Sequence, residues 1–226
     1  MNIDLVVFDL AGTTVEDGDT VNGCLRETLA AAGLEVSTVA VNEVMGLAKP
    51  EALRRLIAES EMKEHLIDRV AEIHADFVAQ MIHFYQTDPT VREVPGASET
   101  FSRLQKRRIK VALNTGFSRD ITQSLLERLG WQQSPLIDAS VTSDEVKRGR
   151  PHPEMIRHLM KRLMVRDARR VAKVGDTPVD LLEGANAGCE FVIGVTGGSH
   201  THDQLEHFPH SHLIASVADL PAILGL

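Results

Sequence analysis

Short runs of apolar residues alternate with amphipathic stretches along most of this chain. The runs are rich in β-branched residues, which is typical of strands buried on both faces of a parallel sheet. They occupy residues 3–9, 109–114, 170–175 and 191–195, with a weaker run at 212–214. Helical patterns lie between the runs, near residues 96–107, 118–129, 152–164 and 178–187. The alternation predicts a doubly wound α/β fold with a parallel sheet, in which ligand sites form at the carboxyl ends of the strands.

The section from residue 16 to residue 94 interrupts this alternation, because helical patterns follow one another there without a convincing strand. These patterns lie near residues 20–33, 40–47, 50–60 and 62–86. We therefore expect an inserted α-helical cap over 16–94 and a core made of 1–15 and 95–226. Turn-forming residues at Val94-Pro95-Gly96 suit a hinge between the two parts.

Composition narrows the classes of function. The formal net charge of −8 argues against a general nucleic-acid surface, which needs a basic stripe to displace counterions. No run is long enough to cross a membrane, and no signal peptide is visible. Cys24 and Cys189 lie far apart and form no Cys-x-x-Cys pair, which favours reduced thiols. We expect a cytoplasmic protein whose partners are small molecules, with no nucleic acid and no membrane among them.

Polar residues with catalytic potential follow three of the predicted strands. Asp9 ends the first, Thr115 and Gly116 follow the second, and Asp176 and Asp180 follow the third. Each has an ordinary explanation when taken alone, as a turn residue or as a carboxylate that complements a helix dipole. At a strand tip of an α/β fold, however, the same groups can bind a phosphoryl group or a metal.

A basic residue, Arg150, stands directly before a predicted helix, and the Pro151 that follows it fits a helix-start position. Taken alone, Arg150 is an ordinary surface arginine. Taken in order, Asp, Thr, Arg and Gly-Asp-x-x-x-Asp resemble the four motifs of the haloacid dehalogenase (HAD) superfamily. The resemblance covers essentially the whole chain and implies that superfamily's Rossmann-like core.

This resemblance implies a nucleophile and a set of phosphoryl-binding groups. Asp9 would attack phosphorus and form an aspartyl-phosphate, which divides one difficult displacement into two easier ones. Thr115, the Gly116 amide and Arg150 would bind the transferring phosphoryl oxygens, where preorganised donors stabilise developing charge.

The resemblance also implies a Mg²⁺ site. Mg²⁺ prefers oxygen ligands, and Asp9, the backbone carbonyl of Ala11 and Asp176 would hold it, with Asp180 in support. Because position 11 contributes its carbonyl, an alanine there leaves metal binding intact.

Ala11 is also where the chain departs from the HAD phosphatases, which normally carry a second Asp there as general acid/base. An alanine cannot protonate an alkoxide leaving group. The segment Met45-Gly46-Leu47-Ala48-Lys49 is similar to the segment that holds the Schiff-base lysine of the phosphonatases, the phosphonoacetaldehyde hydrolases. An imine on Lys49 would accept the electron pair that is released when a carbon–phosphorus bond breaks.

The likeness implies a substrate site lined by Ala11, Met45, Gly46 and Gly116. Two positions depart from the phosphonatase pattern, because Ala52 stands where those enzymes carry a histidine and Phe117 where they carry a tyrosine. These departures leave the exact phosphonate open.

The leading hypothesis is a Mg²⁺-dependent hydrolase that cleaves the carbon–phosphorus bond of phosphonoacetaldehyde or a related phosphonate. One alternative is a HAD phosphatase acting on a small phosphate monoester, with a proton donor recruited from the cap. A degenerate HAD binding module is the other, although the intact Asp9, Asp176 and Asp180 argue against it. The family's habit of dimerising through the cap also suggests a homodimer.

Five histidines crowd the C-terminal part of the chain. His-x-His spacing can bind zinc, but a polar loop near the rim of the fold is the favoured interpretation. The histidines are His200, His202, His207, His210 and His212.

Overall fold

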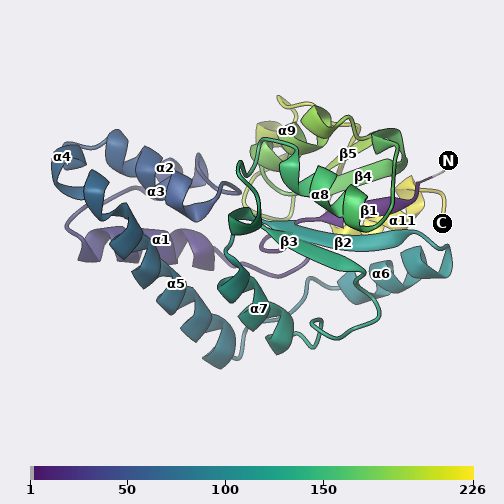
Figure 1. The fold of residues 1–226 in the computed structure, drawn as a ribbon, viewed down its shortest axis with the longest axis horizontal. Coiled ribbons are helices and arrows are strands. Elements are labelled where there is room, and N and C mark those ends of the chain that lie inside the picture. The colour runs from purple at the N-terminus through teal and green to yellow at the C-terminus, as the bar shows by residue number, and fades with distance from the viewer. Residues whose placement is uncertain (1–2) are drawn as a thin grey trace.

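The structure, a computed structural model, describes residues 3–226 and consists of a helix-covered sheet with a group of helices beside it (Figure 1). Six parallel strands form the sheet in the order β3-β2-β1-β4-β5-β6. This confirms the predicted doubly wound α/β fold. The strands are β1 (Leu5–Phe8), β2 (Lys110–Thr115), β3 (Ala139–Thr142), β4 (Val171–Gly175), β5 (Phe191–Val195) and β6 (His212–Ile214).

β1 runs through the middle of the sheet and is buried on both faces. Phe8 packs edge-to-face on Phe101 of α6 (Ala97–Lys106), with the ring centroids 5.0 Å apart. Val7 points to the opposite face and joins the apolar cluster that includes α8 (Glu154–Arg162). Because alternate residues of one strand face two apolar layers, β1 is a continuous apolar run instead of an alternating one.

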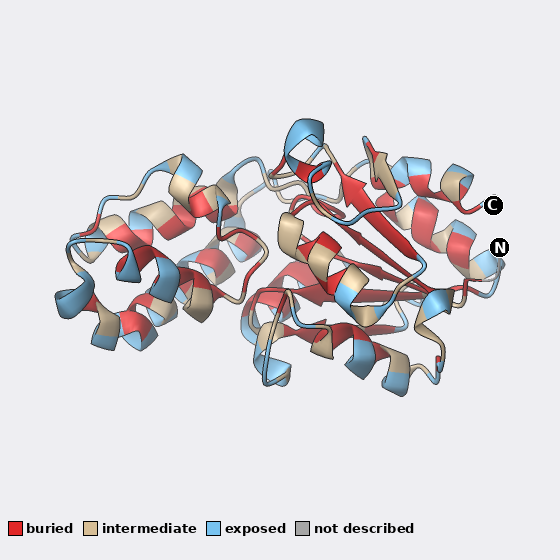
Figure 2. Cartoon of the chain, turned by 90° about the horizontal axis from the view of Figure 1, so that it is seen from above, coloured by how far each residue is buried: buried red, intermediate tan, exposed pale blue. Residues whose placement is uncertain are grey.

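Helices cover both faces of the sheet, and strands β1, β4 and β5 are buried along their length (Figure 2). α8 and α9 (Pro178–Ala187) pack on one face, α9 over β4 and β5. α6, α7 (Arg119–Arg128) and the short α11 (Leu220–Ile223) lie on the other face and share its apolar cluster. A further short helix, α10 (His202–Leu205), follows β5.

A separate group of helices lies between β1 and α6 in sequence (Figure 1). The longest, α5, packs against α1 and α3 and also against α7 of the core, and it buries residues four apart, Ile73, Phe77, Met81 and Tyr85. Isolated bridges of Val15 with Ala11 and Glu93 hold the two connecting segments together. The division of the chain at 15/16 and 94/95 stays a prediction. The helices are α1 (Thr20–Ala31), α2 (Thr38–Asn42), α3 (Lys49–Ala58), α4 (Lys63–Leu66), a 3-10 turn (Ile67–Arg69) and α5 (Val70–Thr87).

Three element predictions were wrong. Strand β3 went unrecognised, because its four residues Ala-Ser-Val-Thr carry two hydroxyls and form the edge of the sheet. The helix expected over 40–47 ends at Asn42, and the chain then turns through Gly46, whose φ is 80°. The helix expected over 62–86 is broken by the 3-10 turn. Across residues 3–226, each helix is too short or too polar to span a membrane.

Candidate active site

The candidate catalytic groups meet at the carboxyl edge of the sheet. β1 lies between β2 and β4 in parallel register, so Asp9, Thr115 and Asp176 emerge side by side. Asp180 joins them from the first turn of α9, where its carboxylate caps the helix by accepting a hydrogen bond from the Thr177 backbone amide and also accepts one from the Thr177 hydroxyl. Oxygens of Asp9, Asp176 and Asp180 lie within 4.8 Å of one another.

The Asp176 carboxylate is held firmly. Its Oδ1 accepts a hydrogen bond from Thr13 Oγ1 at 2.9 Å, and its Oδ2 accepts one from the Ser199 amide at 2.7 Å. Gly12 and Gly198 make room for it, because a Cβ at either position would lie 2.3 or 2.4 Å from Oδ2. The oxygens of the carboxylate are thus oriented before any ligand binds.

Arg150 lies beneath these carboxylates with a fully buried side chain. Its Nη1 is 2.7 Å from Asp9 Oδ1 and 3.0 Å from Asp180 Oδ1, and its Nε is 3.2 Å from Glu183 Oε2. The Nη2 donates to the carbonyl and side-chain oxygens of Asn114 at 2.7 and 2.6 Å. The guanidinium is therefore fixed by four residues, with one nitrogen aimed at the candidate nucleophile.

A second buried cation, Lys173 of β4, completes this network. Its Nζ is 2.8 Å from Asp180 Oδ1 and 2.8 Å from Asn114 Oδ1. Although burial opposes ionisation, Arg150 and Lys173 hold the pKa of Asp180 below its usual value.

Negative charge nevertheless exceeds positive charge in this buried network. Burial, with Asp180 adding to it, raises the pKa of both Asp9 and Asp176 to about 6. Four carboxylates, those of Asp9, Asp176, Asp180 and Glu183, face the cations Arg150 and Lys173. The oxygen donors and the two surplus negative charges suit a divalent cation such as Mg²⁺.

A loop before α3 closes over the site from the group of helices. A Cβ on Gly46 would lie 2.3 Å from Thr177 Oγ1, and a Cβ on Gly116 would lie 2.3 Å from the Leu47 carbonyl oxygen. Only glycines at these two places let the loop and the strand tips approach so closely. The contact brings Lys49, the first residue of α3, against the core.

Lys49 is 3% exposed, and its ammonium makes no hydrogen bond with any residue of the described chain. The ring of Phe117 lies beneath it, with the centroid 5.3 Å from Nζ. Burial, with Arg150 adding to it, lowers the pKa of Lys49 to about 8, although Asp9 and Asp17 oppose the shift. A buried amine of this kind can lose its proton near neutral pH and act as a nucleophile.

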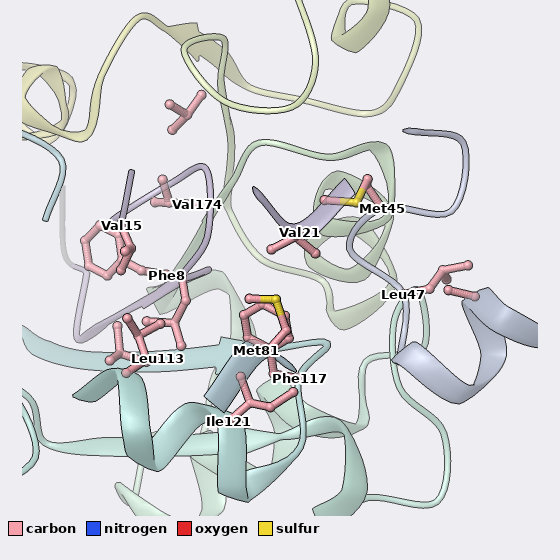
Figure 3. Close-up of a cluster of buried hydrophobic side chains, with 14 of the residues drawn as sticks. Phe8, Val15, Val21, Met45, Leu47, Met81, Leu113, Phe117, Ile121 and Val174 are labelled. Carbon is pink, nitrogen blue, oxygen red and sulfur yellow. The ribbon is translucent and has the colours of Figure 1, made fainter. Parts of the chain in front are cut away.

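Lys49 and Asp9 line one pocket, which we call the catalytic pocket. Val21, Met45 and Phe117 are apolar residues that line it, and Figure 3 shows their side chains in a cluster of buried hydrophobic residues. The structure thus brings all the predicted catalytic and substrate-site residues together in this pocket. Asp176 and Asp180, the predicted metal ligands, lie beside Asp9. The pocket is lined by Asp9, Ala11, Val21, Met45, Gly46, Lys49, Thr115, Gly116, Phe117, Arg150, Thr177 and Ser199.

Several residues that matter here escaped the sequence analysis. Lys173 and Glu183 are fully buried charges, and the lysine inside an otherwise apolar strand was a usable signal. Asn114 fell at the end of the run 109–114 and was given no part in the site. Pro151 was interpreted wrongly, because α8 begins at Glu154 and Pro151 lies in the preceding turn.

Other predicted features lie outside the site. Ala52 is buried inside the group of helices and does not line the catalytic pocket. Among residues 3–226, the three aspartates form the single cluster with metal-binding geometry, and it includes none of the C-terminal histidines.

Comparison with known proteins agrees with this geometry. The family profile described as haloacid dehalogenase-like hydrolase matches residues 6–194. A phosphonoacetaldehyde hydrolase of Bacillus cereus is 30% identical over 88% of this chain and 78% of its own length. One of Bacteroides fragilis is 26% identical over 99% and 96%. The chain spans 36% of a bifunctional phosphonoacetaldehyde hydrolase/aminoethylphosphonate transaminase of Clostridioides difficile, with 28% identity.

Solved structures show the same fold. A phosphonoacetaldehyde hydrolase-like protein from Oleispira antarctica superposes with a TM-score of 0.87, covering 100% of this chain and 92% of that one at 23% identity. CbbY from Rhodobacter sphaeroides, solved in complex with phosphate, has a TM-score of 0.80 at 19% identity, covering 99% and 100%.

Proposed function

Because this chain belongs to the haloacid dehalogenase-like hydrolases, we propose that it cleaves the carbon–phosphorus bond of phosphonoacetaldehyde or a related phosphonate whose aldehyde carbon lies β to phosphorus. The observation that carries the proposal is the buried Lys49 amine, free of hydrogen bonds, in one pocket with Asp9. The relatives named phosphonoacetaldehyde hydrolase support it.

The reaction begins on Lys49. Its neutral amine adds to the aldehyde carbon, and loss of water gives an imine whose carbon is bonded to the carbon that bears phosphorus. The apolar wall around Phe117 favours the neutral amine over the ammonium, because burial penalises the charge.

Asp9 then attacks phosphorus. The carbon–phosphorus electron pair passes into the imine and leaves an enamine on Lys49, while the phosphoryl group is transferred to the Asp9 carboxylate. Thr115, Gly116 and Arg150 line the pocket, and Thr115, the Gly116 amide and Arg150 would stabilise the phosphoryl oxygens. Water then releases phosphate from Asp9 and aldehyde from Lys49.

Ala11 fits this chemistry. A phosphate ester leaves as an alkoxide and needs a nearby acid, whereas here the imine takes up the leaving electron pair. An aspartate at position 11 would add another carboxylate to a site that already carries surplus negative charge. The alanine therefore suits a phosphonate substrate better than a phosphate monoester.

The aspartates suggest the cofactor. Asp9, Asp176 and the Ala11 carbonyl would hold Mg²⁺, with Asp180 in support. When bound, Mg²⁺ supplies positive charge that lets the Asp9 carboxylate approach an anionic phosphonate. A cytoplasmic location and a homodimer formed through the helices of residues 16–94 stay predictions.

The test is covalent trapping. With phosphonoacetaldehyde and Mg²⁺, borohydride should reduce the imine, attach substrate carbon to Lys49 and inactivate the enzyme. Lys49→Arg should lose both trapping and phosphonate cleavage, because a guanidinium stays protonated. Asp9→Asn should keep the trapping and lose phosphate release. Cleavage by Lys49→Arg, or faster hydrolysis of phosphate esters than of any phosphonate by the wild type, would favour a phosphatase.

A further inference from the structure

The proposed reaction needs protons at two points. The carbonyl oxygen must take up one proton to leave as water when the imine forms. The terminal carbon of the enamine must take up another before the aldehyde can be released. Hydrolysis of the imine and of the aspartyl-phosphate returns one proton each, so the cycle balances. A group that gives and takes protons must therefore lie close to Lys49.

The catalytic pocket itself does not supply that group. Of the described residues that line it, three are ionisable, Asp9, Lys49 and Arg150. Asp9 carries the phosphoryl group, and Lys49 is occupied as the imine. Arg150 stays protonated, because Asp180 and Asp9 raise its pKa although burial opposes them.

A second pocket adjoins the catalytic one at Ser199, which lines both. We call it the hinge pocket, because it lies where the chain passes between the sheet and the group of helices. It is lined by Gly12, Val15, Glu16, Asp17, Gly18, Asp19, Val94, Pro95, Gly197, Gly198 and Ser199.

Asp17 is the carboxylate of the hinge pocket that is hydrogen-bonded to a residue of the catalytic pocket. Its Oδ1 accepts a hydrogen bond from the Val21 amide at 3.2 Å, and Val21 lines the catalytic pocket. Its backbone carbonyl accepts the Thr20 amide at 2.9 Å. These bonds fix the partly buried Asp17 at the start of α1.

Asp17 and Lys49 also interact through their charges. After Asp9, Asp17 is the strongest negative charge acting on Lys49, and Lys49 is the strongest charge acting on Asp17. Burial raises the pKa of Asp17 to about 6, and Asp19 and Asp9 add to the rise, although Val21 and Lys49 oppose it. Burial, with Asp17 and Asp9 adding to it, also holds the pKa of Tyr85 in α5 well above its usual value. A carboxyl of this kind can be found in either protonation state near neutral pH.

We propose that Asp17 carries the protons of the reaction between the hinge pocket and the imine on Lys49. As the acid it protonates the departing oxygen, and after regaining a proton it protonates the enamine carbon. This role rests on the proposed function and replaces an acid that neither Ala11 nor Ala52 can provide.

The test compares Asp17→Asn with Asp19→Asn. The amide at position 17 keeps an oxygen for the Val21 N–H but carries no proton to donate. Asp19 lines the same pocket, and its φ of 68° is one that Asn adopts easily. With phosphonoacetaldehyde and Mg²⁺, Asp17→Asn should lower kcat and the rate of borohydride trapping by about 100-fold or more, whereas Asp19→Asn should stay within about twofold of the wild type.

Two further measurements distinguish a role of Asp17 in proton transfer from a purely structural role. Beryllofluoride binding to Asp9 with Mg²⁺, followed by ¹⁹F NMR, should be unchanged in Asp17→Asn, and Asp17→Glu should recover part of kcat. If Asp17→Asn fails to fold, Asp17→Ser keeps the oxygen acceptor and takes its place.

Equal kcat in Asp17→Asn and Asp19→Asn would overturn the proton-transfer role of Asp17. The role would also be overturned if Asp17→Asn lost beryllofluoride binding together with kcat. A wild type that traps no substrate would instead overturn the proposed function, and the role of Asp17 with it.

Discussion

At the scale of single residues, Lys49 determines which reaction the site can perform. The side chain is buried over the Phe117 ring with no hydrogen-bonding partner, an arrangement that costs stability when the amine is charged. Such a position is difficult to explain for a structural lysine, which would extend its ammonium into water. It is the position that imine formation requires, because a neutral amine must meet an aldehyde.

The first prediction concerns pH. Because the pKa of Lys49 is lowered to about 8, the amine is protonated and unreactive below that pH and free above it. The rate of borohydride trapping should therefore rise with pH, pass its midpoint near pH 8 and level off above it. Mg²⁺ bound among the aspartates adds positive charge near the amine and should move the midpoint lower. A midpoint near the ordinary value of 10.5 would contradict the burial argument.

Sequence analysis found the residues that project from strand ends but not the charges buried beneath them. Asp9, Thr115 and Asp176 follow apolar runs, and strand order makes such positions converge. Glu183 and Lys173 lie opposite one another only because α9 packs on β4. That packing is a property of the tertiary structure, and no local periodicity indicates it.

At the scale of elements, the loop between α2 and α3 determines whether Lys49 reaches the core. Gly46 adopts a φ of 80°, a value that favours glycine, and it lies directly against Thr177. The loop therefore depends on the absence of a side chain at one position.

The second prediction tests this loop. In Gly46→Ala, the added Cβ would lie 2.3 Å from Thr177 Oγ1 and 2.6 Å from Val179 Cγ2, so the loop must move outward and take Lys49 with it. Trapping on Lys49 should fall by about 100-fold, as expected for a misplacement of about 1 Å. Beryllofluoride binding at Asp9 should remain, because the core is untouched.

Gly23→Ala in α1 is the matched control. Nothing lies within 4 Å of a Cβ there, and the residue is helical. The substitution should raise the free energy of unfolding by about 0.5–1 kcal/mol and leave trapping unchanged. Full trapping activity in Gly46→Ala would show that the loop tolerates a side chain and that Lys49 is positioned by other contacts.

The same loop shows why the helices and strands could be predicted from the sequence more reliably than the residues at which they end. Strands β1, β2, β4, β5 and β6 were predicted within a residue or two at each end, because burial on both faces demands continuous apolar runs. The helix expected over 40–47 was too long. Its apolar residues Val44, Met45 and Leu47 are buried, but in a turn and not in a helix. Burial alone does not distinguish the two.

At the scale of the whole molecule, charge is distributed unevenly. The chain carries a formal net charge of −8, and four carboxylates are concentrated around two cations at the buried edge of the sheet. Burying unbalanced charge is costly, which is why the pKa values of Asp9 and Asp176 are raised. The fold therefore gives up stability at this edge, and a divalent cation would restore it.

The third prediction follows from this balance. Mg²⁺ at a concentration 100 times its Kd should stabilise the fold by about 2.7 kcal/mol, because it binds the folded state alone. Thermal unfolding should then shift upward by several degrees, and EDTA should reverse the shift. Asp203→Asn, a change to an exposed carboxylate of α10, should respond to Mg²⁺ as the wild type does.

Asp176→Asn separates the cost of buried charge from the benefit of the metal. The amide keeps an oxygen for Thr13 or the Ser199 amide while removing one buried negative charge. Without metal, the variant should be at least as stable as the wild type, and its unfolding temperature should no longer respond to Mg²⁺. If it is instead much less stable without metal, Asp176 serves the fold through its hydrogen bonds. If its Mg²⁺ response equals that of the wild type, the cation binds elsewhere. Only the combination of kept stability and lost response fits a carboxylate that is retained in a buried position for the sake of metal binding.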